Sequence, residues 1–230
     1  MSKRINMNAW ESEQKDAGLR TELVFILDAS GSMAGLEADT IGGFNAMIAE
    51  NREEPGEATV SVITFNNRSS VLLDRVPIGD VPRLTRKQYR CSGCTALLDA
   101  VGAAIERIDL VQKVQPKGYE ADKVLFAITT DGMENASRDY TYRRVRKMIE
   151  GHREMGWEFI FIGANIDVVA EAEKLGIDRG RAAGYVPDGF GTETVYQAAS
   201  IAVSACRCGA DLDKAGWRIG LDEDVKHRGR

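Results

Sequence analysis

Uninterrupted apolar runs are the strongest constraint on the fold of this sequence. The first run, Leu-Val-Phe-Ile-Leu at residues 23–27, contains no polar residue, and neither does Val-Leu-Phe-Ala-Ile at 124–128. Runs of this kind are typical of strands that are buried on both faces. Such strands occur mainly in parallel sheets with helices on both sides, so the two runs predict an α/β fold.

Segments with helical spacing of apolar residues alternate with the strand-like segments. Strands are predicted at residues 23–27, 58–65, 71–73, 123–130, 157–163 and 180–186, and helices at 36–50, 96–110, 139–151, 166–175 and from a capping Thr192 onward. The alternation predicts a Rossmann-like, doubly wound and mostly parallel sheet with helices on both faces. Asn66 and Asn67 separate two apolar runs as in a hairpin, which predicts one antiparallel edge strand.

The chain of 230 residues suits one α/β domain with a polar extension at each end. Residues 1–20 are polar and charged, with Trp10 as their only large apolar anchor, and predict an N-terminal arm. The domain is expected at residues 21–207. Residues 208–230 are rich in charge without a clear period and predict a tail, in which Trp217 is the one sign of docking.

Charge and hydropathy narrow the choice of partners and compartment. A net charge of −5 argues against a nucleic-acid or anionic-membrane partner, because such binders normally carry a basic excess. The first residues lack the apolar stretch of a secretory signal, and no segment is long and apolar enough to suggest a transmembrane helix. We therefore expect a cytoplasmic protein, in which the four cysteines are reduced.

A polar loop follows the first apolar run directly. Asp28, Ser30 and Ser32 alternate with Ala29 and Gly31, and Gly31 allows a tight turn that aims the three oxygen-bearing side chains at one point. Carboxylates and hydroxyls are hard donors that suit Mg²⁺, Mn²⁺ or Ca²⁺. Taken alone, the same residues are equally typical of a strand-end turn with a serine helix cap.

A second aspartate, Asp131, ends the strand predicted at residues 123–130. In doubly wound sheets the first strand is central, and ligands bind where the strand order reverses beside it. If the two strands are neighbours across that reversal, Asp28 and Asp131 end side by side.

Three short motifs in this order resemble the metal-ion-dependent adhesion site of the von Willebrand factor type A family: Asp28-x-Ser30-x-Ser32, Gly93-Cys94-Thr95 and Thr130-Asp131-Gly132. The resemblance covers roughly residues 21–207 and is to a small, stand-alone, bacterial- or phage-like member. Cys94 departs from the family, which usually carries glycine there.

The resemblance implies a binding module with a divalent ion as its anchor. It implies hydroxyl ligands at Ser30, Ser32 and Thr95, and carboxylates at Asp28 and Asp131 that bind the ion directly or through water. Mg²⁺ is the expected ion, with Mn²⁺ or Ca²⁺ as alternatives and no other cofactor. An Asp or Glu carboxylate of a protein partner is expected to fill the open coordination position.

Three further polar residues are expected at the rim of the site. Asn135 is expected to order the loop after Asp131, and Asn165 follows another strand that opens onto the same edge. Asp99 recurs in similar segments of the family, although an acid in a first helical turn also favours the helix terminus by itself.

No catalytic residue is predicted. His152 and His227 are the only histidines, both are expected on the surface, and no nucleotide-binding glycine motif is present. Two alternatives stay open, namely a metal-dependent phosphoryl or ester hydrolase and a structural subunit that does not use the site.

The cysteines and the basic residues between 75 and 90 could form two further kinds of site, for which the sequence gives less support. Cys91, Cys94, Cys206 and Cys208 are expected to be free thiols rather than a zinc site, and a redox-sensitive disulfide between the first two is the next alternative. Basic residues between 75 and 90 are expected on a solvated loop rather than in a recognition patch.

Overall fold

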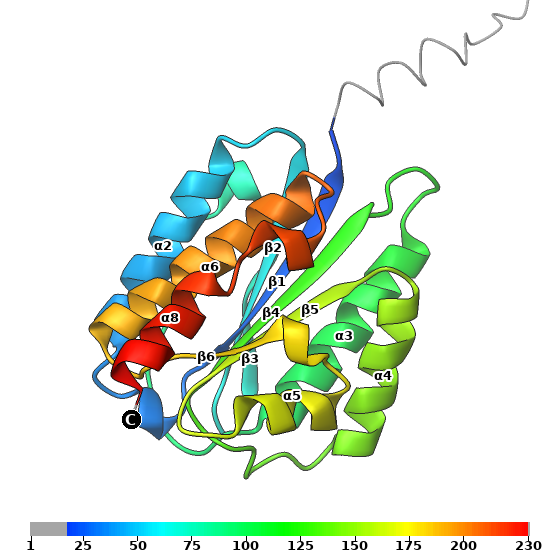
Figure 1. The fold of residues 1–230 in the computed structure, drawn as a ribbon. Helices are drawn as coiled ribbons and strands as arrows, with labels where there is room; N and C mark the ends of the chain where they lie inside the picture. Colours follow the sequence, from blue (N-terminus) through cyan, green and yellow to red (C-terminus); the bar gives the residue numbers. More distant parts are fainter. Residues whose placement is uncertain (1–17, 230) are drawn as a thin grey trace, which may run out of the picture.

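A computed structural model describes residues 18–229 of the chain. The N-terminal arm predicted at residues 1–20, including Trp10, falls almost entirely outside these residues. Strands and helices alternate along the chain (Figure 1). The strands are β1 (Arg20–Asp28), β2 (Glu57–Phe65), β3 (Ser69–Pro77), β4 (Lys123–Thr130), β5 (Glu158–Gly163) and β6 (Ala182–Gly184). The helices are α2 (Glu37–Arg52), α3 (Leu97–Val114), α4 (Tyr142–Glu154), α5 (Val168–Leu175), α6 (Gly189–Arg207), α7 (Leu212–Ala215) and α8 (Ile219–Arg228), with short 3₁₀ turns at Gly31–Met33, Ile78–Asp80 and Arg179–Arg181.

The six strands form one sheet in the order β3-β2-β1-β4-β5-β6. Every neighbouring pair is parallel except β2 and β3, which form the antiparallel edge. The sequence prediction of a mostly parallel, doubly wound sheet with one antiparallel edge strand is therefore confirmed. Because β1 and β4 are neighbours, with Leu27 paired to Thr129, Asp28 and Asp131 leave the same edge of the sheet.

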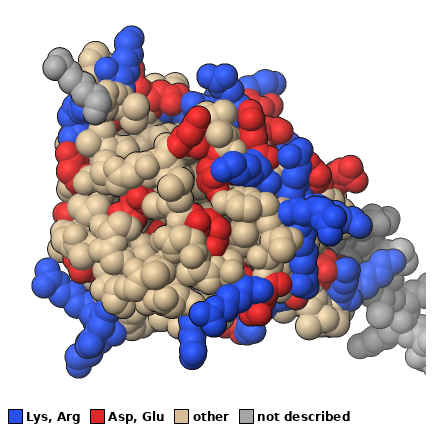
Figure 2. All heavy atoms as spheres, turned by 90° about the horizontal axis from the view of Figure 1, so that it is seen from below, with Lys and Arg blue, Asp and Glu red and all other residues tan. Residues whose placement is uncertain are grey.

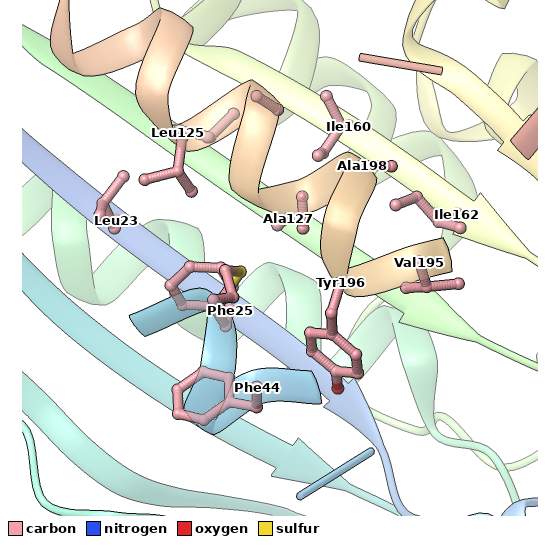
Figure 3. Packing of buried hydrophobic residues seen from close by; sticks show 14 of the residues in the cluster. Leu23, Phe25, Phe44, Leu125, Ala127, Ile160, Ile162, Val195, Tyr196 and Ala198 are labelled. Carbon is pink, nitrogen blue, oxygen red and sulfur yellow. The ribbon is translucent and has the colours of Figure 1, made fainter. Parts of the chain in front are cut away.

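Helices cover both faces of the sheet, and each face has its own apolar core. α2, α6 and α8 lie on one face, whereas α3, α4 and α5 lie on the other (Figure 1). On the first face, Phe25 of β1 packs edge-to-face against Phe44 of α2 at 5.5 Å between ring centroids, and Tyr196 of α6 lies beside them (Figure 3). Gly43 of α2 lets α6 approach, since a Cβ there would lie 2.4 Å from the Tyr196 ring.

The last helices differ from the sequence prediction in two ways. Asp188, and not Thr192, caps α6, because its carboxylate accepts a hydrogen bond of 2.8 Å from the Gly191 N–H. Thr192 lies inside the first turn and is buried. The segment predicted as a tail contains α7 and α8, and its Trp217 and Leu221 are buried in the core beneath α6.

A buried carboxylate lies at the opposite end of β1 from the polar loop. The side chain of Glu22 is fully buried and pairs with Arg75 of β3, whose Nε lies 2.7 Å from Oε2. Arg75 has a φ of 50° at a register shift in the antiparallel pair. Burial raises the pKa of Glu22, and the pairing with Arg75 offsets only part of that effect.

We expect the Glu22→Gln variant to gain stability relative to the wild type as the pH rises above about 4.5, the ordinary pKa of the carboxyl. With a raised pKa the folded wild type holds the proton more tightly than the unfolded chain, so its free energy of unfolding falls across that window. Urea unfolding of both proteins between about pH 4.5 and 7 measures the difference between their free energies of unfolding. Groups that titrate in the same way in both proteins do not contribute to this difference. Glu57→Gln, at an exposed position, is the matched control. A difference that does not change with pH would contradict this account of Glu22.

Candidate metal site

Two aspartates lie buried at the carboxyl edge of β1 and β4. Asp28 is 1% exposed and Asp131 is 3% exposed. Neither forms an ion pair with any lysine, arginine or histidine of residues 18–229. Burial raises the pKa of Asp131, and the neighbouring Asp28 carboxylate raises it further, whereas the Ser32 hydroxyl lowers it. Buried carboxylates in proteins are normally hydrogen-bonded, paired or bound to a metal, and a cation beside these two would offset the cost of burying them.

Hydroxyl groups surround the two carboxylates. The Ser30 and Ser32 Oγ atoms lie 3.0 Å apart, and Ser32 Oγ donates to Asp131 Oδ1 at 2.5 Å. A Cβ placed on Gly132 would lie 3.6 Å from Thr95 Oγ1 and 3.7 Å from Ser32 Oγ, so these hydroxyls flank the same glycine. The structure thus brings together residues from three separate segments.

Asp28 organises the loop that follows β1. Its Oδ1 accepts the Ser30 N–H at 2.7 Å, and its Oδ2 accepts the Thr130 hydroxyl at 2.6 Å. The main-chain carbonyl of Asp28 accepts the hydroxyl of the buried Tyr89. Asp28 is buried, and its removal would leave the Ser30 N–H and the Thr130 hydroxyl without their partner.

Thr95 is held in place through its main chain. Asn135 accepts the Thr95 N–H with its side-chain oxygen at 2.9 Å and donates its own N–H to the Thr95 carbonyl at 3.0 Å. This reciprocal pair connects the loop after β4 to the start of α3. Asn135 thus holds the main chain of Thr95 against the loop after β4.

The other rim residues act on the backbone of the surrounding loops. Asp99 accepts the N–H groups of the three successive residues 138–140, each at 2.9 Å, so it organises the loop before α4 as well as lying in the first turn of α3. Asn165 has a φ of 59° and donates to the Asp131 carbonyl at 3.3 Å. Gly31 donates its N–H to the Gly93 carbonyl at 3.0 Å, and a Cβ there would lie 3.2 Å from that oxygen. Its role is close approach to a neighbouring loop.

Three residues that support the site were not predicted from the sequence: Thr130, Tyr89 and Glu134. Glu134 accepts four hydrogen bonds from the start of α3 and from its own loop, including the Leu98 N–H at 2.9 Å. Thr130 precedes Asp131 directly, so its position beside the motif was a usable signal. Tyr89 and Glu134 carry no such signal, because their contacts depend on how distant loops meet.

His152 lies away from the two carboxylates. His152 is only 12% exposed in its side chain, stacks near Trp157 at 4.3 Å between ring centroids, and lies 3.2 Å from Asp109. Trp157 precedes β5, whose other end faces the site, so His152 lies toward the far end of the sheet. The expectation of a solvated His152 is therefore wrong, whereas His227 is exposed on α8.

The cysteines are distributed over two environments. Cys206 is buried in α6, and burial raises its pKa to about 12. Cys91 is half-buried, and desolvation raises its pKa to about 11, whereas Cys94 and Cys208 are exposed. In residues 18–229, no group of three or more His, Cys, Asp or Glu side chains is placed to hold a metal ion.

Comparison with known proteins supports the fold. No family model matches the chain. No curated protein matches it significantly. Among solved structures, proximal thread matrix protein 1 from the mussel byssus matches 84% of this chain with a TM-score of 0.56 at 14% identity, and its second crystal form matches 83% with 0.54 at 14%. The same mussel protein with a zinc-occupied MIDAS motif matches 80% with a TM-score of 0.52 at 16% identity.

The class defined by these findings is an α/β protein with a von Willebrand factor A type fold. The matches cover 47% of the mussel protein, so this chain spans about half the length of the solved protein it resembles. At such low identity the likeness extends to the fold alone. None of the helices in residues 18–229 combines the length and apolar character needed to cross a membrane.

Proposed function

We propose that this protein is a metal-dependent protein-binding module. Ser30, Ser32 and Thr95 are the proposed hydroxyl ligands of the ion, and Asp28 and Asp131 are the proposed carboxylates, bound directly or through water. A partner protein supplies an Asp or Glu carboxylate to the remaining coordination position. The protein is proposed to act in the cytoplasm without a nucleic-acid or membrane partner.

The observation that carries this proposal is the pair of buried carboxylates, Asp28 and Asp131, which no cationic side chain of residues 18–229 pairs with. Moving an ionised carboxylate from water into a protein interior generally costs several kcal/mol, and a nearby cation offsets this cost by electrostatic attraction. The hydroxyls of Ser30 and Ser32 add hard oxygen donors around the pair. Mg²⁺ prefers oxygen ligands and keeps several of its waters, so an incomplete protein cage suits it.

The donor set also explains why a carboxylate would be the preferred partner group. Hydroxyl ligands are neutral, so two aspartates at most neutralise a divalent ion, and water-mediated contact leaves positive charge on it. When bound, the ion supplies a Lewis-acidic centre that attracts an anionic oxygen. The protein's own contribution is orientation: Asp28 fixes Ser30 and Thr130, and Asn135 fixes Thr95.

Mg²⁺ is the proposed ion, and Mn²⁺ or Ca²⁺ would use the same oxygen donors. The zinc in the MIDAS motif of one mussel structure supports a divalent cation at this place in the fold. A binding role rather than catalysis is proposed, because His152 lies toward the far end of the sheet from the two carboxylates, so it cannot serve them as a general base.

Affinity capture from the native cytosol tests this function. We expect a partner protein to be retained by the wild type in Mg²⁺, to be released by EDTA, and to be absent with Asp131→Asn. That variant keeps an oxygen that accepts the Ser32 hydroxyl but removes the charge, so the fold is expected to persist, which circular dichroism would check. Glu57→Gln, an exposed carboxylate at the other end of the sheet, is the control for loss of charge. Retention that is equal in Mg²⁺ and EDTA would contradict the proposal.

A further inference from the structure

A cleft opens beside the proposed metal site. It has a volume of about 860 Å³ and lies between the β2–β3 turn, the start of α3 and the loop before α4. Cys94 and Asn135 line it, and these residues adjoin or contact Thr95. Arg68 and Arg138 line the same cleft and are exposed. The cleft therefore joins the metal site to two cationic side chains.

A second, smaller hollow lies beside the segment that follows the loop after β1. It has a volume of about 290 Å³ and is lined by Arg86, Arg90 and Cys91, together with residues that follow the loop after β1. The segment carrying these arginines is attached to β1: Tyr89 donates to the Asp28 carbonyl, and Ser92 donates its N–H to the Ala29 carbonyl at 2.9 Å. The segment that carries the two arginines is thus attached to the end of β1 and the loop that follows it.

The basic segment is anchored rather than loosely solvated. Val81, Leu84 and Tyr89 are buried, and Asn45 of α2 makes two hydrogen bonds with the Leu84 main chain, at 2.7 Å and 3.0 Å. Between these anchors the basic side chains point outward: Arg83, Arg86, Lys87 and Arg90 are all exposed. Such anchoring lowers the entropy cost of using these cations to bind a partner.

The arginines around the site have no acidic partners within residues 18–229. Elsewhere in those residues most arginines are paired, for example Arg107 with Asp74 and Arg144 with Glu106. The exceptions there are Arg52, Arg83, Arg143, Arg179 and Arg207. None of the four arginines that line the two hollows is in an ion pair: Arg68, Arg86, Arg90 and Arg138. This contrasts with a net charge of −5 for the whole chain.

The carboxylates that line the hollows are mostly used internally. Asp99 accepts three main-chain N–H groups, and Glu37 accepts the Gly35 N–H at 2.7 Å. Of the three carboxylates that line the two hollows, that of Asp139 alone accepts no hydrogen bond from residues 18–229. Figure 2 views the molecule from this end, where acidic atoms lie near the middle of a largely uncharged face and both basic and acidic side chains lie around its margin.

We infer that the partner segment is acidic on both sides of the carboxylate that binds the metal. The central carboxylate would meet the ion, and flanking Asp or Glu residues would meet Arg68 and Arg138 in the cleft and Arg86 and Arg90 in the hollow. This inference rests on the proposed metal-dependent function and names its partner class. A nucleic acid or an anionic lipid surface fits less well, because an extended polyanion would also meet the remainder of a chain whose net charge is −5.

Short fluorescein-labelled peptides test the inference by fluorescence anisotropy in Mg²⁺ and in EDTA. One peptide carries a single central Asp among Gly, Ser and Gln, and a second adds Glu on both sides. A third replaces the central Asp of the second by Asn, and a single-stranded oligonucleotide is the other polyanion. We expect the Glu-flanked peptide to bind roughly tenfold more tightly than the single-Asp peptide, since exposed ion pairs contribute modestly and several act together. The ratio between the affinities for these two peptides should fall as the salt concentration is raised, because salt screens ion pairs.

Two double variants test whether the arginines cause the preference for the Glu-flanked peptide. One double variant combines Arg68→Gln with Arg138→Gln, and the other combines Arg86→Gln with Arg90→Gln. Each should lower the ratio of the affinity for the Glu-flanked peptide to that for the single-Asp peptide, while the affinity for the single-Asp peptide stays unchanged. Lys117→Gln with Lys123→Gln removes the same charge at the opposite end of the sheet and should leave the ratio intact.

The outcomes separate the inference from the function on which it rests. Equal Mg²⁺-dependent affinity for the single-Asp and Glu-flanked peptides would overturn the acidic partner while the metal-dependent function stands. Absence of Mg²⁺-dependent binding by any peptide would overturn both. Binding of the Asn-centred peptide or the oligonucleotide as tight as that of the Glu-flanked peptide, with or without EDTA, would show a general polyanion surface and overturn the inference.

Discussion

The Thr95→Val variant is expected to bind Mg²⁺ and Mn²⁺ at least 10- to 100-fold more weakly than the wild type, the range typical of removing even an outer-shell group from a metal site. Valine keeps the branched shape of threonine and loses the hydroxyl. Thr95 is 3% exposed, and its main chain is held by Asn135, so its position in the loop does not depend on the hydroxyl. The change therefore removes a proposed ligand without removing a structural bond.

Isothermal titration calorimetry with Mg²⁺ and Mn²⁺ measures this effect without a partner. Thr194→Val is the matched control, because the Thr194 hydroxyl donates to the Phe190 carbonyl within α6 at 3.0 Å. The wild type and the control should also gain stability with metal, by about 2.7 kcal/mol at a concentration 100 times the Kd. Unchanged affinity in Thr95→Val would remove Thr95 from the ligand set, whereas loss of affinity in the control would point to a general effect on folding.

The sheet could be predicted from the sequence because its signal is local. Residues 124–128 are apolar without interruption, and β4 runs from Lys123 to Thr130 as predicted. The antiparallel β3 was predicted at 71–73 but extends over Ser69–Pro77, since this half-exposed edge strand includes polar residues on both sides of its apolar run. The length of an edge strand depends on its pairing with β2, and its own sequence does not show that pairing.

The sequence predicted that Asp28 and Asp131 leave the same edge of the sheet, as they do, but it did not predict the burial of Asp28. Asp28 follows an apolar run, and a polar residue in such a place normally marks the end of a buried strand. Its burial comes from Tyr89 and Thr130, which approach from other segments. Contacts of this kind join residues about 60 and 100 positions apart in the chain, and no local pattern encodes them.

The C-terminal segment could not be predicted because its apolar residues are few and widely spaced. Leu212, Trp217 and Leu221 are buried among neighbours that are mostly charged. Helical periodicity needs several apolar residues at regular intervals, and three residues across two short helices do not supply them. Burial follows from packing on α6 and β6, with α6 providing most of the surface.

Replacing Trp217 with Ala is expected to lower the free energy of unfolding by about 3–5 kcal/mol, the usual cost of removing a buried large aromatic side chain. Trp217 is 1% exposed and belongs to the core formed by α2, α6 and the sheet. Since single domains are stable by only about 5–15 kcal/mol, the variant should unfold at a much lower urea concentration. A loosely attached tail would give almost no change, because an exposed substitution usually shifts stability by no more than about 0.5 kcal/mol.

Ile219→Ala is the control within the same segment, because Ile219 is 59% exposed and should fall within that small range. Urea unfolding followed by far-UV circular dichroism, which does not depend on tryptophan, measures both variants. A large loss in Trp217→Ala with little change in Ile219→Ala would extend the folded domain beyond residue 207, the end expected from the sequence. α6 would then be an internal helix, with one face on the sheet and another covered by the C-terminal segment. Equal, small effects would instead leave residues 208–230 outside the cooperative unit and restore the predicted boundary.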